Sequence, residues 1–292
     1  AKRAGVDKRI VVTPPNSAGT INTHILAAAY LGEIQDLFIV GGAQAIAALA
    51  YGTQSIPKCV KIFGPGNAYV AQAKALVSAQ MGGPAIDLPA GPSEAMVLAD
   101  DVANPVFVAA DLLSQAEHDV MAQVVCVCRS QKFADAVFAE INVQLSDLPR
   151  KDIASQALRH GKIIIAPDQD TMVDISNAYA PEHLIVQIEN PARIVQSIRN
   201  AGSVFLGPWT PEAVGDYASG TNHTLPTYGA ARAYSGVTLE SFIKYISIQE
   251  LTRSGLETLG PCVERLAEIE GLEAHRRAVS RRLKAPEGTN NA

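Results

Sequence analysis

Short apolar strands alternate with helical segments along most of this chain, and this alternation constrains the fold more than any other feature. In the first part, apolar runs at 10–13, 37–40 and 60–63 are separated by helical patterns at 21–31, 44–51 and 69–80, and a run at 95–99 closes the alternation. Strands that are apolar on successive residues and separated by helices predict a parallel sheet covered on both faces. We therefore expect an α/β module over residues 1–92.

The same alternation is repeated after Gly91. Its expected helices lie at 104–118, 131–144, 149–159 and 168–179, and its expected strands at 122–128, 162–166, 184–186 and 203–206. After Ser235-Gly236-Val237 the pattern changes to helices near 239–245, 261–269 and 272–283. The predicted fold class is α/β, with two Rossmann-like parallel-sheet modules (1–92 and 93–237) and a helical C-terminal extension (238–292).

Composition excludes several classes of protein. A net charge of −5, with no basic block before the last helix, argues against nucleic acid as a partner. No apolar run reaches transmembrane length and no signal peptide opens the chain, so we expect a cytoplasmic protein without a membrane partner. Four Cys without a C-x-x-C pair give no disulfide framework or cysteine zinc site. The abrupt start resembles the end of a helix already under way, so the N-terminus is expected to be cut.

The helix expected over 104–118 carries an amide and an imidazole one turn apart. At about 100° per residue, Gln115 and His118 lie near each other on one face, with Asp111 beside them. Such an amide oxygen and imidazole can hold a metal ion from one rigid element. The alternative is an ordinary solvated or hydrogen-bonded pair, which the local sequence favours because most polar residues lie at the surface.

A second polar pair follows Pro181, which ends a helix and keeps Ala180 out of the right-handed α region. Glu182 and His183 then lie at a loop-to-strand junction, where adjacent side chains share one pocket only if the junction is irregular. A carboxylate beside an imidazole is suited to general-base chemistry and water activation. A surface Glu and a capping His remain the ordinary alternative.

Three further segments have the character of binding loops. The turns at 41–44 and 64–67 follow strands, and Gln44 and Asn67 can hydrogen-bond a ligand there, although position 69 is Tyr where the dinucleotide fingerprint needs Gly. Ordinary turns are the alternative. Thr210 and Pro211 are expected to begin a short helix that carries Asp216. The polar loop that follows, 217–226, contains a His, and loops of this kind often carry function.

Taken together, these segments resemble the histidinol dehydrogenase family from residue 1 to about 284. The segments that carry the resemblance are 41–46, 64–67, 88–94, 115–118, 180–184, 215–217 and 220–226, followed by Glu270 and His275. The family oxidises L-histidinol to L-histidine through L-histidinaldehyde in two NAD-dependent steps, the last step of histidine biosynthesis, with one zinc ion per subunit in a homodimer. One departure is that the family's N-terminal portion, which completes the second sheet and supplies a Tyr near the cofactor, is not in this sequence.

The resemblance implies a role for each matching residue. Glu182 and His183 match the acid–base pair, and the last helix is expected to cross to the partner subunit. The implied zinc ligands are Gln115, His118, Asp216 and His275. The implied substrate contacts are the same four residues together with Ser93, His183, His223 and Glu270. The implied NAD contacts are Gln44 and Asn67. Two alternatives are a zinc hydrolase, which leaves the glycine turns unexplained, and a zinc-binding or dimerisation fragment without catalysis.

Overall fold

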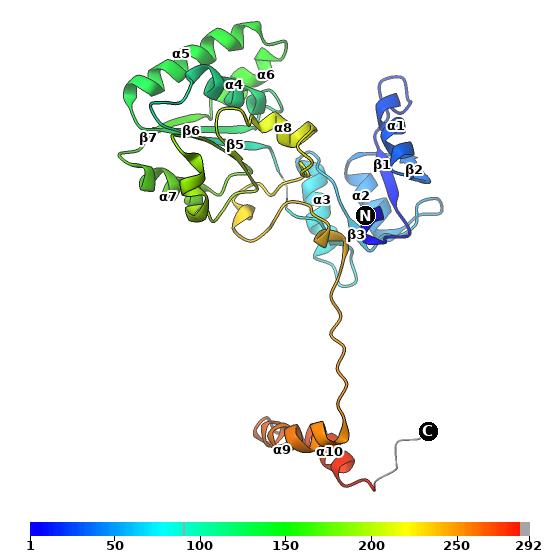
Figure 1. Ribbon diagram of the computed structural model, residues 1–292. Coiled ribbons are helices and arrows are strands. Elements are labelled where there is room, and N and C mark those ends of the chain that lie inside the picture. Colours follow the sequence, from blue (N-terminus) through cyan, green and yellow to red (C-terminus); the bar gives the residue numbers. More distant parts are fainter. Residues whose placement is uncertain (90, 287–292) are drawn as a thin grey trace. The chain divides into compact units, whose positions relative to one another are not determined.

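The computed structural model describes residues 1–89 and 91–286 of the protein. Ala90, which belongs to the motif at 88–94, and residues 287–292 of the predicted extension lie outside the described residues. The chain divides into two compact units, Ala1–Ile243 and a second unit that begins at Lys244. Figure 1 labels most of the helices and strands.

A five-stranded, fully parallel sheet forms the largest part of the first unit. Its strand order is β7-β6-β5-β8-β9. Central β5 is buried at every residue, because β6 and β8 pair along both its edges and an apolar core lies on each of its faces. The run at 95–99, expected to close the first module, is therefore the middle of this second sheet. The strand bounds are β5 Glu94–Ala99, β6 Gln123–Cys128, β7 Lys162–Ile165, β8 His183–Gln187 and β9 Ser203–Leu206.

Helices cover both faces of this sheet, as the apolar strands predicted. Helices α4, α5 and α6 pack on one face and α7 on the other (Figure 1). Cys126 and Cys128 point into the first of these two cores, beside Val137 of α5. Both are free, buried thiols. The helix bounds are α4 Pro105–Ala116, α5 Gln131–Asp147, α6 Lys151–Leu158 and α7 Gln169–Tyr179.

The first 89 residues build a smaller α/β module from two separate strand pairs. β1 pairs with β2 and β3 with β4, both in parallel. The expected strand at 60–63 is reduced to Lys61–Ile62, too short to join the two pairs into one sheet. The apolar core of the module includes Ile46, Leu49 and Val77. The bounds are β1 Ile10–Thr13, α1 Thr23–Leu31, β2 Asp36–Ile39, α2 Gly42–Tyr51, β3 Lys61–Ile62, α3 Ala68–Ser78 and β4 Ala85–Ile86.

The second unit contains a helical hairpin, α9 (Arg253–Ile269) and α10 (Glu273–Leu283). The prediction that Pro261 starts a helix is wrong, because Pro261 lies inside α9. The helices approach closely at buried Gly260, where a Cβ would come within 2.9 Å of Leu283 Cδ1. The helix expected at 239–245 is also wrong, since only a 3₁₀ turn forms there, at Glu240–Phe242 of the first unit. Among the described helices, none is long and apolar enough to cross a membrane.

Candidate active site

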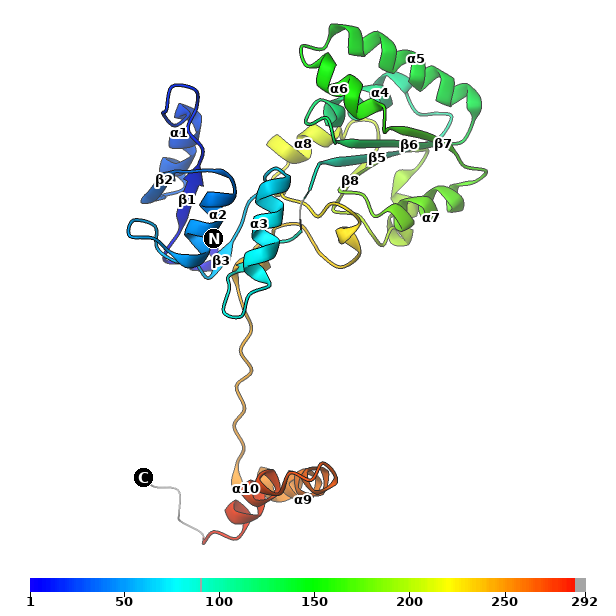
Figure 2. The same ribbon diagram turned by 180° about the vertical axis from the view of Figure 1, so that it is seen from behind.

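The candidate site lies at the amino-terminal ends of β5 and β8, where Glu94 and His183 are the first strand residues. This is unexpected, because open parallel sheets usually bind ligands at the carboxyl ends of their strands. The crossover helix α4 runs back along the sheet from the end of β5, so its carboxyl end returns Gln115 and His118 to this edge. Helix α8 (Glu212–Tyr217) lies beside α4 (Figure 2).

Three potential metal ligands converge between α4 and α8. One ligand atom each from His118, Glu212 and Asp216 lies within 4.8 Å of the others. Ser114 of α4 donates its hydroxyl hydrogen to Glu212 Oε2 at 2.8 Å, which fixes this buried carboxylate beside α4. Two of the four predicted zinc ligands, His118 and Asp216, are thus brought together, and Gln115 lies one turn before His118 on the same helix.

Glu212 is a site residue that the sequence analysis assigned no role. The sequence predicted Thr210 as the helix cap, but α8 begins at Glu212 and Thr210 Oγ1 donates instead to the carbonyl of Leu206. With that start, Glu212 and Asp216 are separated by four residues and share one helical face. This spacing of two carboxylates in a short helix was the signal that could have identified Glu212.

His183 is buried and its hydrogen bonds fix its tautomer. The ring Nδ1 lies 3.0 Å from the carbonyl oxygen of Glu94 and 3.6 Å from Glu182 Oε2. Because a carbonyl can only accept, Nδ1 carries the proton and Nε2 keeps a free lone pair. Nε2 lies 3.9 Å from both Glu212 Oε1 and Asp216 Oδ1 and has no hydrogen-bond partner among the described residues. His183 can therefore accept a proton at Nε2.

Glu182 is also buried, so its reading as a surface carboxylate is wrong. The junction before it is irregular, as sharing a pocket requires: Ala180 has φ +60°, a left-handed conformation that avoids the clash of a right-handed helix with Pro181. The Glu182 carbonyl then accepts the Ser203 N–H of β9 at 2.9 Å, while its Oε2 accepts the Glu94 N–H of β5 at 2.8 Å. The side chain is thereby directed toward His183.

The site is strongly acidic. Burial, reinforced by the charges of Glu94, Glu212 and Asp216, raises the pKa of Glu182 to about 9, although the bond from the Glu94 N–H opposes the shift. Burial also raises the pKa of Asp111 to about 6, against the stabilising bond from Gln187 Nε2. A site with this many carboxyl groups favours a cation, since positive charge would stabilise the ionised forms.

Three buried acceptors among the described residues around the site lack a partner, and one of them belongs to Gln115, which lies one turn before His118 of the metal-ligand cluster. Gln115 Oε1, His183 Nε2 and Glu94 Oε2 have no hydrogen-bond partner within the described part of the chain. An unsatisfied buried acceptor is costly unless a ligand supplies the interaction. An imidazole, carboxylates and an amide oxygen together form a donor set that suits zinc. The residues of the site therefore fit such an ion.

Other predicted site residues lie at its margins or in the second unit. Ser93 precedes Glu94 and is half-buried, and its carbonyl accepts the Gln123 N–H. His223 is exposed at the start of a buried segment, 224–227. Glu270 and His275 belong to the second unit, where Glu270 caps α9 and His275 is an exposed residue of α10. Their zinc and substrate roles stay predictions.

The two glycine turns of the first module precede helices, as the sequence predicted, and their role in binding a ligand stays a prediction. Gly42, with φ +71°, begins α2, and exposed Gln44 lies in its first turn. Asn67 is the N-cap of α3, and its Oδ1 accepts the Val70 N–H at 3.2 Å. The sequence pattern did not predict this capping role. The cap leaves the Asn67 Nδ2 amide as the donor that a cofactor would meet.

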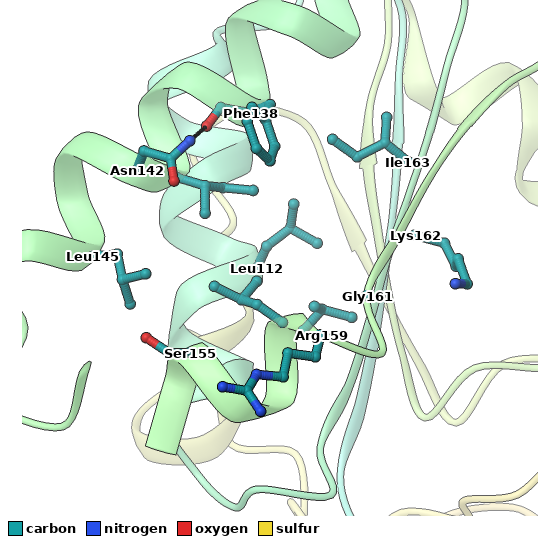
Figure 3. A pocket seen from close by; sticks show the side chains of 12 residues that line it. Leu112, Phe138, Asn142, Leu145, Ser155, Arg159, Gly161, Lys162 and Ile163 are labelled. Carbon is teal, nitrogen blue, oxygen red and sulfur yellow. Dashed lines mark hydrogen bonds between the residues drawn. The ribbon is translucent and has the colours of Figure 1, made fainter. Parts of the chain in front are cut away.

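Two cavities of the first unit lie outside the metal-ligand cluster. One, of about 490 Å³, is lined mainly by apolar residues between α4, α5, α6 and β7, such as Leu112, Phe138 and Ile163 (Figure 3). None of the predicted site residues lines it. The other, of about 650 Å³, lies between α3, the segment 86–92 and the loop that carries Tyr228. Its lining includes Gly91, Pro92 and Tyr228, which lie close to the site residues Ser93 and Glu94 in sequence or by hydrogen bond.

Comparison with known proteins decides the family. The histidinol dehydrogenase family model matches residues 1–283. The chain belongs to the histidinol dehydrogenase family. It is 54% identical over 283 residues to a histidinol dehydrogenase of Bacteroides thetaiotaomicron and 52% identical over 285 residues to a chloroplastic one of Arabidopsis thaliana. The crystal structure of histidinol dehydrogenase from Elizabethkingia anophelis matches with a TM-score of 0.91 at 51% identity, and it supports the predicted α/β fold class.

The chain is shorter than these histidinol dehydrogenases. The match with the Bacteroides thetaiotaomicron protein covers 97% of this chain but 66% of that protein. The Arabidopsis thaliana match covers 97% of this chain and 61% of the relative. In the Elizabethkingia anophelis structure, 94% of this chain corresponds to 63% of the solved chain. The chain thus spans slightly less than two thirds of the curated relatives that it matches.

Proposed function

We propose that the protein is an oxidoreductase that converts L-histidinol to L-histidine through L-histidinaldehyde, using zinc and two NAD⁺, as the last step of histidine biosynthesis. The observation that carries the proposal is the position of buried His183. Its Nε2 has no hydrogen-bond partner among the described residues and lies near the carboxylates of Glu212 and Asp216, which belong to the cluster with His118. In a chain of the histidinol dehydrogenase family, this arrangement supplies a base beside a metal-binding position.

Gln115, His118 and Asp216 would hold the zinc ion, together with His275 of the partner subunit in a homodimer. Zinc has no redox chemistry, so when bound it would supply charge and positioning, and NAD⁺ would accept the hydride. Glu212, which is buried and hydrogen-bonded to Ser114, would lie against the ion or the substrate amine. Ser93, His223 and the partner's Glu270 complete the proposed substrate contacts.

His183 and Glu182 would share the proton transfers. His183 accepts the alcohol proton at Nε2, and its Nδ1–H bond to the Glu94 carbonyl orients the ring during this step. Glu182 serves as the base that helps water add to the aldehyde, so that a second hydride can leave from the hydrate. Its raised pKa of about 9 keeps it protonated at neutral pH until positive charge in the site favours the carboxylate.

The remaining parts of the proposal concern NAD⁺, domains and location. Gln44 and the Nδ2 amide of Asn67 would contact NAD⁺ at the helix starts of the first module, where backbone N–H groups also favour phosphate. We retain the boundaries 1–92, 93–237 and 238–292 for the two modules and the extension. A cytoplasmic location stays a prediction, and the name of the plant relative states a chloroplast location for that protein.

The activity is tested by absorbance at 340 nm after zinc-loaded protein is mixed with NAD⁺ and L-histidinol. Two NADH per histidinol oxidised are expected, because both oxidations occur on one enzyme. NADH formation that stops at one equivalent, or none at all, would overturn the four-electron assignment.

Zinc content separates this outcome from the alternatives. Because the chain covers less than two thirds of its relatives, zinc binding without turnover would identify a binding fragment. Ester or amide hydrolysis without NAD⁺ would identify a zinc hydrolase. We expect roughly one zinc ion per subunit after dialysis, and a sharp loss of zinc in His118→Ala, since one of four ligands is removed.

A further inference from the structure

Glu94 contacts both members of the proposed catalytic pair and a separate loop. Its backbone N–H donates to Glu182 Oε2 at 2.8 Å, and its carbonyl accepts from His183 Nδ1 at 3.0 Å. The side-chain Oε1 of Glu94 accepts the backbone N–H of Tyr228 at 2.9 Å. Among the described residues, Glu94 is only 3% exposed. One residue at the start of β5 thus joins the pair to the loop.

Tyr228, which donates this bond, has a strained backbone. Its φ of +54° is in the left-handed region, which is unfavourable for a large side chain and persists only where the surroundings impose it. The surroundings here are Glu94 and Gly91: a Cβ on Gly91 would lie 2.0 Å from the Tyr228 ring, so only glycine permits the contact. The Gly91 N–H also donates to Thr227 Oγ1 at 2.6 Å.

The loop that contains Tyr228 begins at His223, a predicted substrate contact. Residues 224–227 are all buried, and His223 is the exposed residue at their start. The Thr224 carbonyl accepts the Val237 N–H, so the far end of the segment is also fixed. The segment between Tyr228 and His223 is therefore hydrogen-bonded at both ends, to Glu94 and to Val237.

We propose that Glu94 is a positioning residue, which couples the loop 223–228 to the Glu182–His183 pair through the Tyr228 N–H bond. This inference rests on the proposed function for its kinetic consequences, but the bond itself does not depend on it. A purely structural role predicts lower stability alone. A positioning role predicts a change in substrate affinity and turnover beyond any loss of stability.

The test compares Glu94→Gln, Glu94→Asp and Glu94→Ala in the full, zinc-loaded chain. Gln keeps an oxygen that can accept the Tyr228 N–H, Asp is one methylene too short to reach it, and Ala has no acceptor. We expect Gln to stay within about threefold of the parent in kcat/KM for histidinol. Asp and Ala should lose roughly 10- to 100-fold, with KM raised as well as kcat lowered, as expected when a reacting group is misplaced by about 1 Å.

Val97→Ala serves as the matched control. Val97 is fully buried in the apolar core on the same strand, three residues after Glu94, so its truncation lowers the melting temperature and leaves the side chain of Glu94 in place. If Glu94→Ala loses no more kcat/KM than Val97→Ala at a similar melting temperature, the positioning role is wrong. It is also wrong if Gln is as impaired as Ala.

Hydrogen exchange tests the coupling between the loop and the pair even if the parent chain shows no turnover. In Glu94→Ala, exchange should speed up both in the loop 223–228 and in the segment 182–185, because the bond couples them. In Glu94→Gln neither should change. Faster exchange in the loop alone would overturn the coupling, while failure of NADH formation in the parent chain would overturn only the proposed function.

Discussion

His183 and Glu182 show how adjacent residues acquire different proton chemistry from their surroundings. Both are buried at the start of β8. His183 has a lone pair at Nε2 that can accept a proton, whereas burial and neighbouring carboxylates raise the pKa of Glu182 and favour its protonated form. His183→Asn should therefore slow the alcohol oxidation. Glu182→Gln should mainly slow aldehyde oxidation, because only that step needs water. Each loss should be roughly 10²–10⁴-fold, the range for a general base.

Supplying L-histidinaldehyde separates the two half-reactions. The aldehyde and the alcohol are each given to the same enzyme with NAD⁺, and single-turnover rates are compared. Equal loss on both substrates in Glu182→Gln would contradict the water-activating role.

The raised pKa of Glu182 also makes a prediction about stability in the zinc-free protein. The ordinary value is 4.5 and the folded value is about 9, so between them the folded state binds the extra proton. The free energy of unfolding must then fall as pH rises from about 5 to 9, since stability decreases with pH wherever the folded state holds more protons. Urea titrations across this range should show a flatter pH dependence for Glu182→Gln than for the parent.

Glu250→Gln is the control for that measurement, because Glu250 is exposed. It should keep the parent's pH dependence. A Glu182→Gln protein with the same slope as the parent would show that Glu182 is ionised in the folded state at neutral pH.

At the scale of elements, the sequence predicts what depends on local pattern and misses what depends on packing. The strand–helix alternation correctly gave parallel sheets, because covered parallel strands are apolar on both faces. It could not give the central place of β5, since strand order depends on contacts distant in sequence. Pro261 was misplaced because a proline within a helix is normally excluded by its missing N–H and its ring.

The residues of the candidate site likewise divide into those that a local sequence pattern predicts and those that depend on packing. Gln115 and His118 were found from helical spacing, and Asp216 only through the resemblance. Glu212 and Glu94 were missed because their roles arise where α8 meets α4 and where β5 meets β8, contacts that no local pattern encodes.

The turn at 64–67 depends on one buried ion pair. Lys74 of α3 and Asp87 after β4 form a hydrogen-bonded pair that is almost wholly buried. Lys74 Nζ also donates to the Gly64 carbonyl at 2.9 Å, and Asp87 Oδ2 accepts the Gly64 N–H at 2.8 Å. Removing one partner leaves a buried charge, which typically costs about 3–5 kcal/mol.

Lys74→Met should therefore lower the free energy of unfolding by about 3–5 kcal/mol and weaken NAD⁺ binding at the turn. Denaturant unfolding and titration with NAD⁺ measure the two effects. The double variant Lys74→Met/Asp87→Leu should recover much of the stability, because no isolated charge remains, but not the binding, because both bonds to Gly64 are lost. Recovery of both would show that the pair does not shape the turn.

At the scale of the whole molecule, helix α9 of the second unit exposes a row of apolar side chains. Leu259, Val263, Leu266 and Ile269 follow one another at helical spacing along α9 and are each more than 40% exposed. Such a stripe is typical of a helix that packs on another surface. The resemblance assigns that surface to a second subunit, whose site would then receive His275 and Glu270.

Subunit exchange tests this shared site directly. His118→Ala and His275→Ala should each be inactive alone, because each lacks a zinc ligand in both sites of its homodimer. A heterodimer of the two has one site with both ligands mutated and one with neither, so activity should return to about half that of the parent dimer. Mass spectrometry confirms that exchange occurred, and zinc content should rise from near zero to roughly one ion per heterodimer. Confirmed heterodimers that remain inactive and free of zinc would mean that His275 serves its own subunit.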